Sequence, residues 1–208
     1  GGPPESLAYD IPASGLPFRQ LLIAALAVVL IGSEYTTGMI RSTMVAVPTR
    51  IPALLAKTLV IAVISFLLGV LAAFTTYLLA QPILSGADLE FGLGADGVLP
   101  SIINTGTVLA LIAVMGVGIG GLLRNTAGGV VTLVGALFVL PIIAALLTGL
   151  ADWVEDAARF LPSAAATQLV ATEVQTGQFN QVEGGLILSG WEVVLLAAAK
   201  KKKKKRDV

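Results

Sequence analysis

Three carboxylates in the C-terminal half of the chain are spaced to act together. Asp152, Glu155 and Asp156 follow an i, i+3, i+4 pattern, which places all three on one face of a helix. Such a group can hold a calcium ion, and two carboxylates can flank a glycosidic bond. No EF-hand loop accompanies them, and Trp153 and Phe160 stand close by. We therefore interpret the group as the solvated face of an external helix that its aromatic residues anchor at a membrane interface.

A fourth carboxylate, Glu192, interrupts the last apolar run of the chain. Carboxylates within a membrane are costly and often lie on proton or substrate paths. Because Glu192 follows Trp191 near one end of its run, a place at the membrane interface is the alternative. The sequence leaves both interpretations open.

Other kinds of chemistry have no residues to support them. The chain contains no Cys and no His, so it has neither a thiolate nor an imidazole to serve as nucleophile, base or metal ligand. The phosphate-binding pattern G-x-x-x-x-G-K-[ST] is also missing from the sequence. We therefore predict a protein that is not an enzyme, that binds no cofactor, metal or nucleic acid itself, and that takes energy from a partner or a gradient.

The composition indicates that the chain folds in lipid. Of 208 residues, 56% are hydrophobic and only 12% are charged, whereas a soluble domain has roughly 25% charged residues. The mean hydropathy is +0.91. These values predict an all-α, polytopic membrane helical bundle.

The apolar runs divide the chain into spans that form one transmembrane domain over residues 1–199. We expect spans at about 16–33, 53–80, 101–123, 126–148 and 186–199. The last is short against the ~20 residues that cross a bilayer. Pro141 is expected to kink the fourth run or to end its regular part.

The charged residues of the connections predict the orientation. Arg41, Arg50 and Lys57 lie in the first connection and Arg124 in the third, whereas the second and fourth are acidic. By the positive-inside rule, this places the first and third connections in the cytoplasm of a multi-pass protein of the plasma (inner) membrane. Residues 81–100 and 149–185, with the amino terminus, are then outside, and we expect one further span before residue 1.

A basic cytoplasmic tail is expected over residues 200–208. Its run of lysines can bind anionic lipid, at ~1 kcal/mol for each residue near the surface. Because lysine is otherwise almost unused in this chain, whether the run is native stays open.

The segment 34–52 is a polar and basic insert between two apolar runs. Ile40, Met44 and Val47 recur at i, i+4, i+7, which predicts a helix with an apolar stripe lying on the membrane surface. Pro48 would end this helix. The alternative is an ordinary cytoplasmic loop that obeys the positive-inside rule.

The insert resembles the permease subunits of type-2 ATP-binding-cassette (ABC) exporters, and most closely those of actinobacteria. The residues that carry the resemblance occur in this order: Glu34, Tyr35, Gly38, Met39, Arg41, Pro48, Arg50 and Lys57. The antiparallel third and fourth runs and the string 160–163 are similar to the same family. The family has six spans, so the resemblance implies that the first span is missing here and that the last is truncated.

The resemblance implies a function and a set of partners. Segment 34–52 would be a coupling segment that docks on a separate ATPase subunit, with Glu34 and Arg41 in polar contact and Pro48 fixing the angle of the helix. The ATPase subunit would use ATP, and a second permease copy would complete an export path lined by the first and fourth runs. A non-transporting membrane anchor or interaction protein and an ion-gradient-driven transporter are the alternatives, and the substrate is not specified.

Small residues cluster near the turn between the third and fourth runs. Gly116 and Gly120 have the spacing that lets two helices approach closely, and Gly128 and Gly129 continue the cluster. We interpret Gly116 and Gly120 as packing residues of the helical hairpin, or alternatively of a contact between two permease copies.

Overall fold

The computed structural model of the chain describes residues 11–13, 15–36, 50–86, 88–95, 97–148, 152–172 and 177–204. Over these residues the regular structure is helical and contains no strand. Four helices are long and apolar enough to cross a membrane: Leu55–Ser85, Val98–Leu123, Thr126–Leu147 and Gln181–Ala199. The predicted all-α membrane helical bundle is confirmed at this level.

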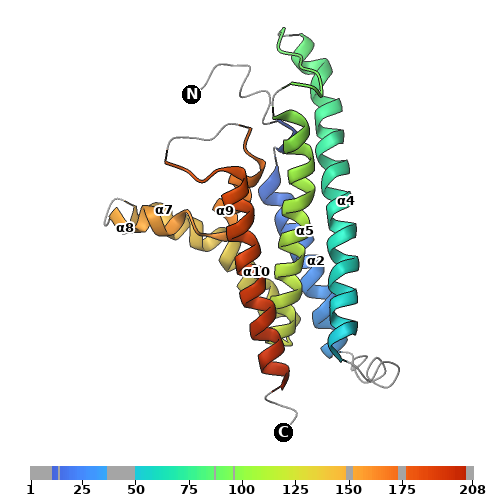
Figure 1. Ribbon diagram of the computed structural model, residues 1–208, viewed down its shortest axis with the longest axis vertical. Helices are drawn as coiled ribbons and strands as arrows, with labels where there is room; N and C mark the ends of the chain where they lie inside the picture. The colour runs from blue at the N-terminus through green and yellow to red at the C-terminus, as the bar shows by residue number, and fades with distance from the viewer. Residues whose placement is uncertain are drawn as a thin grey trace.

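The helices follow one another with short connections (Figure 1). After a single turn, η1 (Ile11–Ala13), they are α2 (Leu16–Thr36), α4 (Arg50–Ser85), α5 (Val98–Leu123), α6 (Thr126–Val134), the π-helical η2 (Gly135–Val139), α7 (Leu140–Leu147), α8 (Asp152–Ala158), α9 (Pro162–Val170) and α10 (Gln181–Lys204). Long helices are expected in lipid because each backbone N–H and C=O must find a partner within its own segment.

Helix α5 is the centre of the bundle. It contains no charged residue, and it packs against α2, α4, α6, α9 and α10. Its side chains Leu109, Ile112 and Met115 are among the largest that are fully buried. By contrast, α4 presents most of its leucines outward, as expected for a helix that faces lipid.

A two-residue turn joins α5 to α6. Arg124 adopts a left-handed conformation (φ 53°), and its N–H donates to the carbonyl of Gly120 at 2.9 Å. Asn125 then caps α6, because its side-chain oxygen accepts a hydrogen bond from the N–H of Gly128 at 3.0 Å. These two caps fix the antiparallel hairpin.

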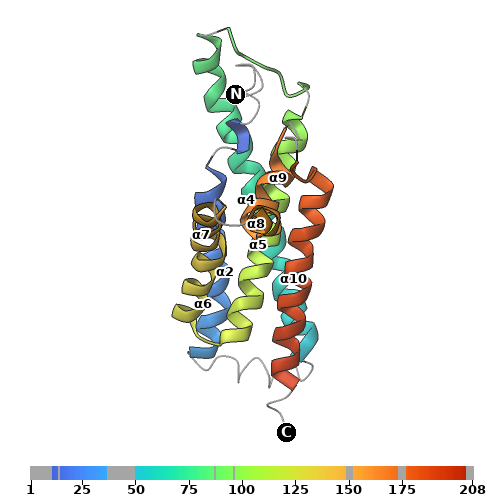
Figure 2. The same ribbon diagram turned by 90° about the vertical axis from the view of Figure 1, so that its left-hand side faces the viewer.

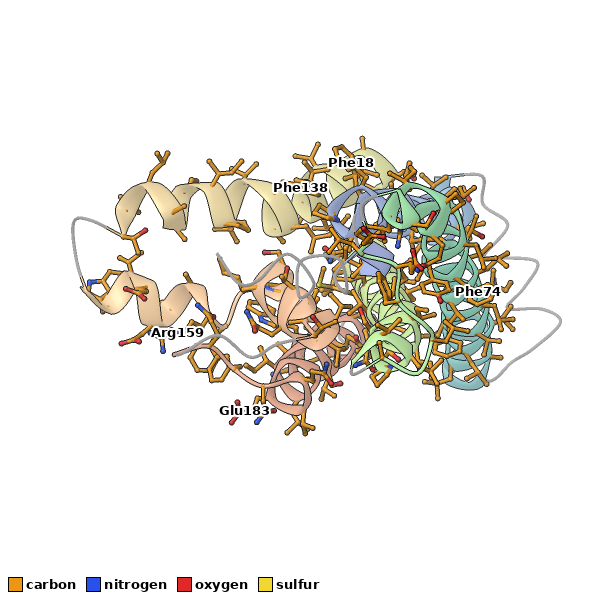
Figure 3. All side chains as sticks on the ribbon, turned by 90° about the horizontal axis from the view of Figure 1, so that it is seen from above. Phe18, Phe74, Phe138, Arg159 and Glu183 are labelled. Atoms are coloured by element: carbon orange, nitrogen blue, oxygen red, sulfur yellow. The ribbon has the colours of Figure 1, made fainter. Side chains whose placement is uncertain are left out.

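The fourth apolar run is bent rather than straight. Its helix passes from α6 through the π-helical η2 into α7, where Pro141 is in the first turn. Proline has no N–H to donate to the carbonyl four residues earlier, and π-helical turns and prolines are established causes of helix bends. Helix α7 leaves the bundle crosswise to its long axis (Figure 1), with α8 beside it (Figure 3).

Helix α10 is longer than the sequence analysis expected. It begins at Gln181 rather than near Leu186 and continues to Lys204. A capping box starts it: the Asn180 side chain accepts from the N–H of Glu183 at 2.9 Å, and the Glu183 carboxylate accepts from the N–H of Asn180 at 2.8 Å. Polar residues at the start of a helix are overlooked when hydropathy alone defines it.

Side chains from α5 and α10 hold the C-terminal end of α9. Ser101 donates to the carbonyl of Val170 at 2.9 Å, and Asn104 donates to that of Leu169 at 2.9 Å. Gln181 donates to the carbonyl of Ala171 at 2.6 Å. The last carbonyls of a helix have no partner within it, so these bonds satisfy them and fix α9 against the bundle.

Three helix ends and one turn lie together at one end of the bundle. The C-terminal end of α2, the N-terminal end of α4, the α5–α6 turn and the C-terminal end of α10 all lie at the lower end in Figures 1 and 2. Segment 37–49, which joins α2 to α4, therefore connects two helices at the same end as the turn that contains Arg124 and the helix that ends in lysines.

Candidate functional site

A cavity of about 590 Å³ lies where α7 and α8 leave the bundle. The start of α2, the bend η2, and helices α7, α8 and α9 line it. Figure 3 shows Phe138 on the side of α7 and Arg159 on the side of α8. The apolar lining comes mainly from Pro17, Leu137, Phe138, Pro141, Ile142, Ala144 and Ala145.

We call the side of the cavity formed by α8, α9 and the residues between and after them the polar wall. Its polar side chains are Glu155, Arg159, Ser163, Thr167 and Gln178, which lie beside the apolar Ala158, Leu161 and Ala164. Gln20 of α2 and Thr148 add two further polar side chains to the lining. Gln20 is only 3% exposed. The cavity thus combines an apolar wall with a polar one, as binding sites for small molecules do.

Arg159 organises the polar wall. Its Nη2 atom lies 3.2 Å from a carboxylate oxygen of Asp156 and 3.7 Å from one of Glu155. The two carboxylates are mostly exposed and the Arg159 side chain is 29% exposed, so these ion pairs contribute little to stability. They leave one guanidinium beside two carboxylates, so this group carries a net negative charge.

Two buried atoms on this wall lack a hydrogen-bond partner among the described residues. They are Nε of Arg159 and Oγ of Ser163, and both can donate a hydrogen bond. A buried donor without an acceptor is costly. Both atoms are also shielded from solvent, so neither is exposed to a molecule in the cavity.

Two carboxylates of the acidic group predicted from the sequence also pair with Arg159. Glu155 and Asp156 are exposed, as the sequence predicted, and they pair with Arg159. Within the described residues, no three His, Cys, Asp or Glu side chains lie close enough together to hold a metal. Arg159, Ser163 and Gln20 were not among the site residues predicted from the sequence, where the available signal was a single arginine in an otherwise acidic connection.

Glu192 lies inside the bundle. It is 8% exposed, and its Oε1 atom has no hydrogen-bond partner in the part of the chain that the structure describes. Helices α5 and α10 run parallel here, because Asn104 approaches Gln181 and Gly118 approaches Leu195. The charged residues nearest along α10 are Glu183 and Lys200, and neither α5 nor α9 contains any.

Most of the predicted coupling residues fall outside the described part of the chain. This applies to Gly38, Met39, Arg41 and Pro48. Glu34 and Tyr35 belong to the last turn of α2, and Arg50 is the first residue of α4. Their assignment to a coupling segment stays a prediction.

The predicted packing glycines lie on the central helix. A Cβ atom on Gly116 would be 2.9 Å from the carbonyl oxygen of Ala24, so Gly116 lets α5 approach α2. Gly120 faces α6, because a Cβ atom on Gly129 of α6 would be 3.8 Å from the Cα atom of Gly120. The same Cβ atom would be 2.6 Å from the Val28 side chain of α2.

Comparisons with protein-family models, with curated proteins and with solved structures find no match to this chain. The class that the fold and the cavity define is therefore a multi-pass helical membrane protein with an amphipathic cavity.

Proposed function

We propose that this chain is the membrane-spanning permease subunit of an ATP-driven ABC transporter of the plasma membrane. It would work with a second permease copy and a separate ATPase subunit that uses the ATP. Segment 34–52 would be the coupling segment, on the cytoplasmic side. The direction is export, on the resemblance of the insert to exporter permeases.

The observation that carries this proposal is the place of the two helices that flank the insert. Helix α2 ends and helix α4 begins at the end of the bundle that also holds the Arg124 turn and the C-terminal end of α10. A partner that moves this segment would act directly on α2 and α4. Both helices contact α5, so that the movement can reach the centre of the bundle.

The bent fourth run supports transport over a purely structural role. The exposed apolar surface of α7 and the cavity beside it give the chain a place for a substrate. A membrane anchor needs neither.

The test is co-purification of the full chain from membranes with a candidate ABC ATPase, followed by measurement of ATP hydrolysis. The double variant Glu34→Lys with Arg41→Glu is expected to insert normally and to lose both association and stimulation. Reversal of two charges removes any complementary contacts and creates repulsion, which costs several kcal/mol in an interface.

Glu90→Lys and Lys201→Glu provide the matched controls, because both residues are exposed and lie outside the insert. They reverse one charge at each end of the molecule, and both variants are expected to retain the ATPase. An ATPase that binds the insert variant as tightly as the native chain would contradict the proposed coupling segment.

The burial of Glu192 favours a second candidate, an ion-gradient-driven transporter. A carboxylate inside a membrane bundle is a place where a coupled proton or cation can bind. The two candidates differ in their energy source. Transport that stops when a protonophore is added while ATP persists would favour the gradient, and transport that continues would favour the ATPase.

A further inference from the structure

We propose that the cavity between α7 and α9 binds an amphiphilic organic monocation, with its apolar body along η2 and α7 and its cationic group against the carboxylate of Glu155. This inference rests on the proposed permease function and names the substrate class of that permease.

The carboxylate of Glu155 carries a negative charge that Arg159 does not balance. Arg159 lies closer to Asp156, at 3.2 Å, than to Glu155, at 3.7 Å, and one guanidinium balances one carboxylate. The contact with Glu155 is longer than a hydrogen bond. The Glu155 side chain is 64% exposed and lines the cavity, whereas Asp156 is not part of the lining. A cation in the cavity can therefore reach this charge and pair with it.

The apolar wall fits the body of such a ligand. Ile142 is 59% exposed and Ala145 is also exposed, yet both line the cavity. The cavity therefore opens at the surface that α7 presents, so that a ligand can enter from the membrane. Phe138 adds an aromatic ring to the lining, and the face of an aromatic ring attracts cations.

Gln20 is an independent sign that the cavity takes a ligand. Its side chain lines the cavity from α2, is only 3% exposed and has no hydrogen-bond partner among the described residues. Unlike Nε of Arg159 and Oγ of Ser163, its amide atoms are not fully shielded. Burying a polar group without a partner is costly. The amide oxygen can accept a hydrogen bond from an ammonium N–H.

The net charge of the polar wall discriminates between ligand heads. An anionic head would be repelled by it, and an uncharged head would leave the charge of Glu155 unbalanced. A cationic head is attracted, and the attraction is stronger beside an apolar wall than in bulk water, because the local dielectric constant is lower.

The size also agrees. A volume of about 590 Å³ falls within the range of ~300–1,000 Å³ that is usual for sites of small molecules. It accommodates a small aromatic body with a short cationic substituent.

The experiment uses the full chain in phosphatidylcholine nanodiscs at neutral pH and three photoreactive benzophenones that differ in one substituent. The substituents are aminomethyl (cationic), hydroxymethyl (uncharged) and carboxylate (anionic). After illumination, labelled peptides are mapped by mass spectrometry. The aminomethyl probe is expected to label the lining segments 137–148 and 155–167 saturably, and at a lower concentration than the other two probes.

Substitutions of the two charged lining residues are expected to act in opposite directions. Glu155→Gln should weaken binding of the aminomethyl probe roughly five- to twentyfold, between the effects of an exposed ion pair and of a buried charged hydrogen bond, and should not affect the hydroxymethyl probe. Arg159→Gln removes the competing positive charge and should strengthen aminomethyl binding roughly two- to fivefold. Glu90→Gln, at an exposed carboxylate outside the cavity, is the matched control and should change nothing.

A third variant tests the cavity itself. Ala144→Trp fills it and is expected to abolish saturable labelling, whereas Ala56→Trp on the exposed surface of α4 is the matched control and is expected to change nothing.

Labelling that does not saturate, that is equal for the three probes, or that persists unchanged in Ala144→Trp would mean partition into lipid only and would overturn the proposal. Should Ala144→Trp fail to fold, Glu155→Gln decides, and an unchanged affinity for the aminomethyl probe would overturn it. The assay contains no ATPase. Saturable labelling that prefers the cation, with no ATPase association, would leave the site intact and reject the permease function, and the opposite pair of results would reject the site alone.

Discussion

Single glycines determine how closely the central helices approach. A Cβ atom on Gly106 of α5 would be 2.7 Å from the carbonyl oxygen of Phe66 in α4, and one on Gly69 would be 2.7 Å from the Cα of Gly106. Small residues at such contacts are a general feature of helix packing in membranes. The two glycines face each other across the α4–α5 interface, where no side chain would fit between the backbones.

We therefore expect Gly106→Ala to lower the free energy of unfolding by about 1–3 kcal/mol, the usual cost of overpacking. Gly190→Ala is the control, because a Cβ atom there meets nothing within 4 Å, and it should stabilise α10 by up to about 1 kcal/mol. Thermal unfolding in detergent measures both. A Gly106→Ala protein as stable as the native one would contradict the close approach.

Sequence patterns reveal only some of these contacts. The spacing of Gly116 and Gly120 within one helix is visible in the sequence, whereas the pairing of Gly69 with Gly106 is between two helices and leaves no spacing to find. Glu192 was visible as a charge in an apolar run, but its burial depends on how α10 packs on α5.

We expect Glu192 to destabilise the helix interface in which it lies. Its buried Oε1 has no partner among the described residues, and burying a polar group without a hydrogen bond costs about 1–3 kcal/mol in proteins. Glu192→Leu is expected to recover an amount of this order and to raise the unfolding midpoint. Glu90→Leu, at an exposed site, is the control. A lower midpoint for Glu192→Leu would show that the carboxylate makes a stabilising contact.

At the scale of elements, helix ends and bends are the features that hydropathy predicts least well. The apolar runs located the long helices, but α10 begins earlier than its apolar run and the fourth run bends at η2. The pattern of Asn180 followed by Glu183 is a helix-start signal that the sequence contains. The π-helical turn has no comparable signal, because Pro141 indicates a bend without specifying its geometry.

The capping box predicts a local effect on α10. Asn180→Ala removes the side-chain acceptor for the N–H of Glu183 and should cost about 1 kcal/mol. Because Gln181 also holds α9, we expect faster amide exchange in the first turn of α10 and at the end of α9. Hydrogen exchange with mass spectrometry measures this. Asn125→Ala, which uncaps α6 instead, should leave the exchange of α10 unchanged.

At the scale of the whole molecule, the fold places the second connection and the α5–α6 turn at opposite ends of the bundle, whereas α8 of the fourth connection lies about midway along its length. The charges of the connections predicted that successive connections lie on alternating sides of the membrane. In the bundle, the α5–α6 turn and the C-terminal end of α10 lie at the same end. What the sequence does not provide is the cavity. It forms only when the start of α2 meets η2, α7, α8 and α9, which are distant from α2 along the chain.

The predicted orientation can be tested with single cysteines, because the native chain has none. Glu90→Cys, Glu155→Cys and Lys201→Cys replace exposed residues in the described structure, and Leu71→Cys lies on the exposed apolar face of α4. In intact cells, a membrane-impermeant maleimide should label positions 90 and 155 and leave position 201 unlabelled until the membrane is opened. Position 71 should resist labelling in both states, because thiols in hydrocarbon rarely ionise and the reagent does not enter.

Labelling of position 201 in intact cells would show that the orientation is the opposite of the predicted one. Segment 37–49 would then face outward, where an intracellular ATPase cannot reach it, and the coupling proposal would fail with the orientation.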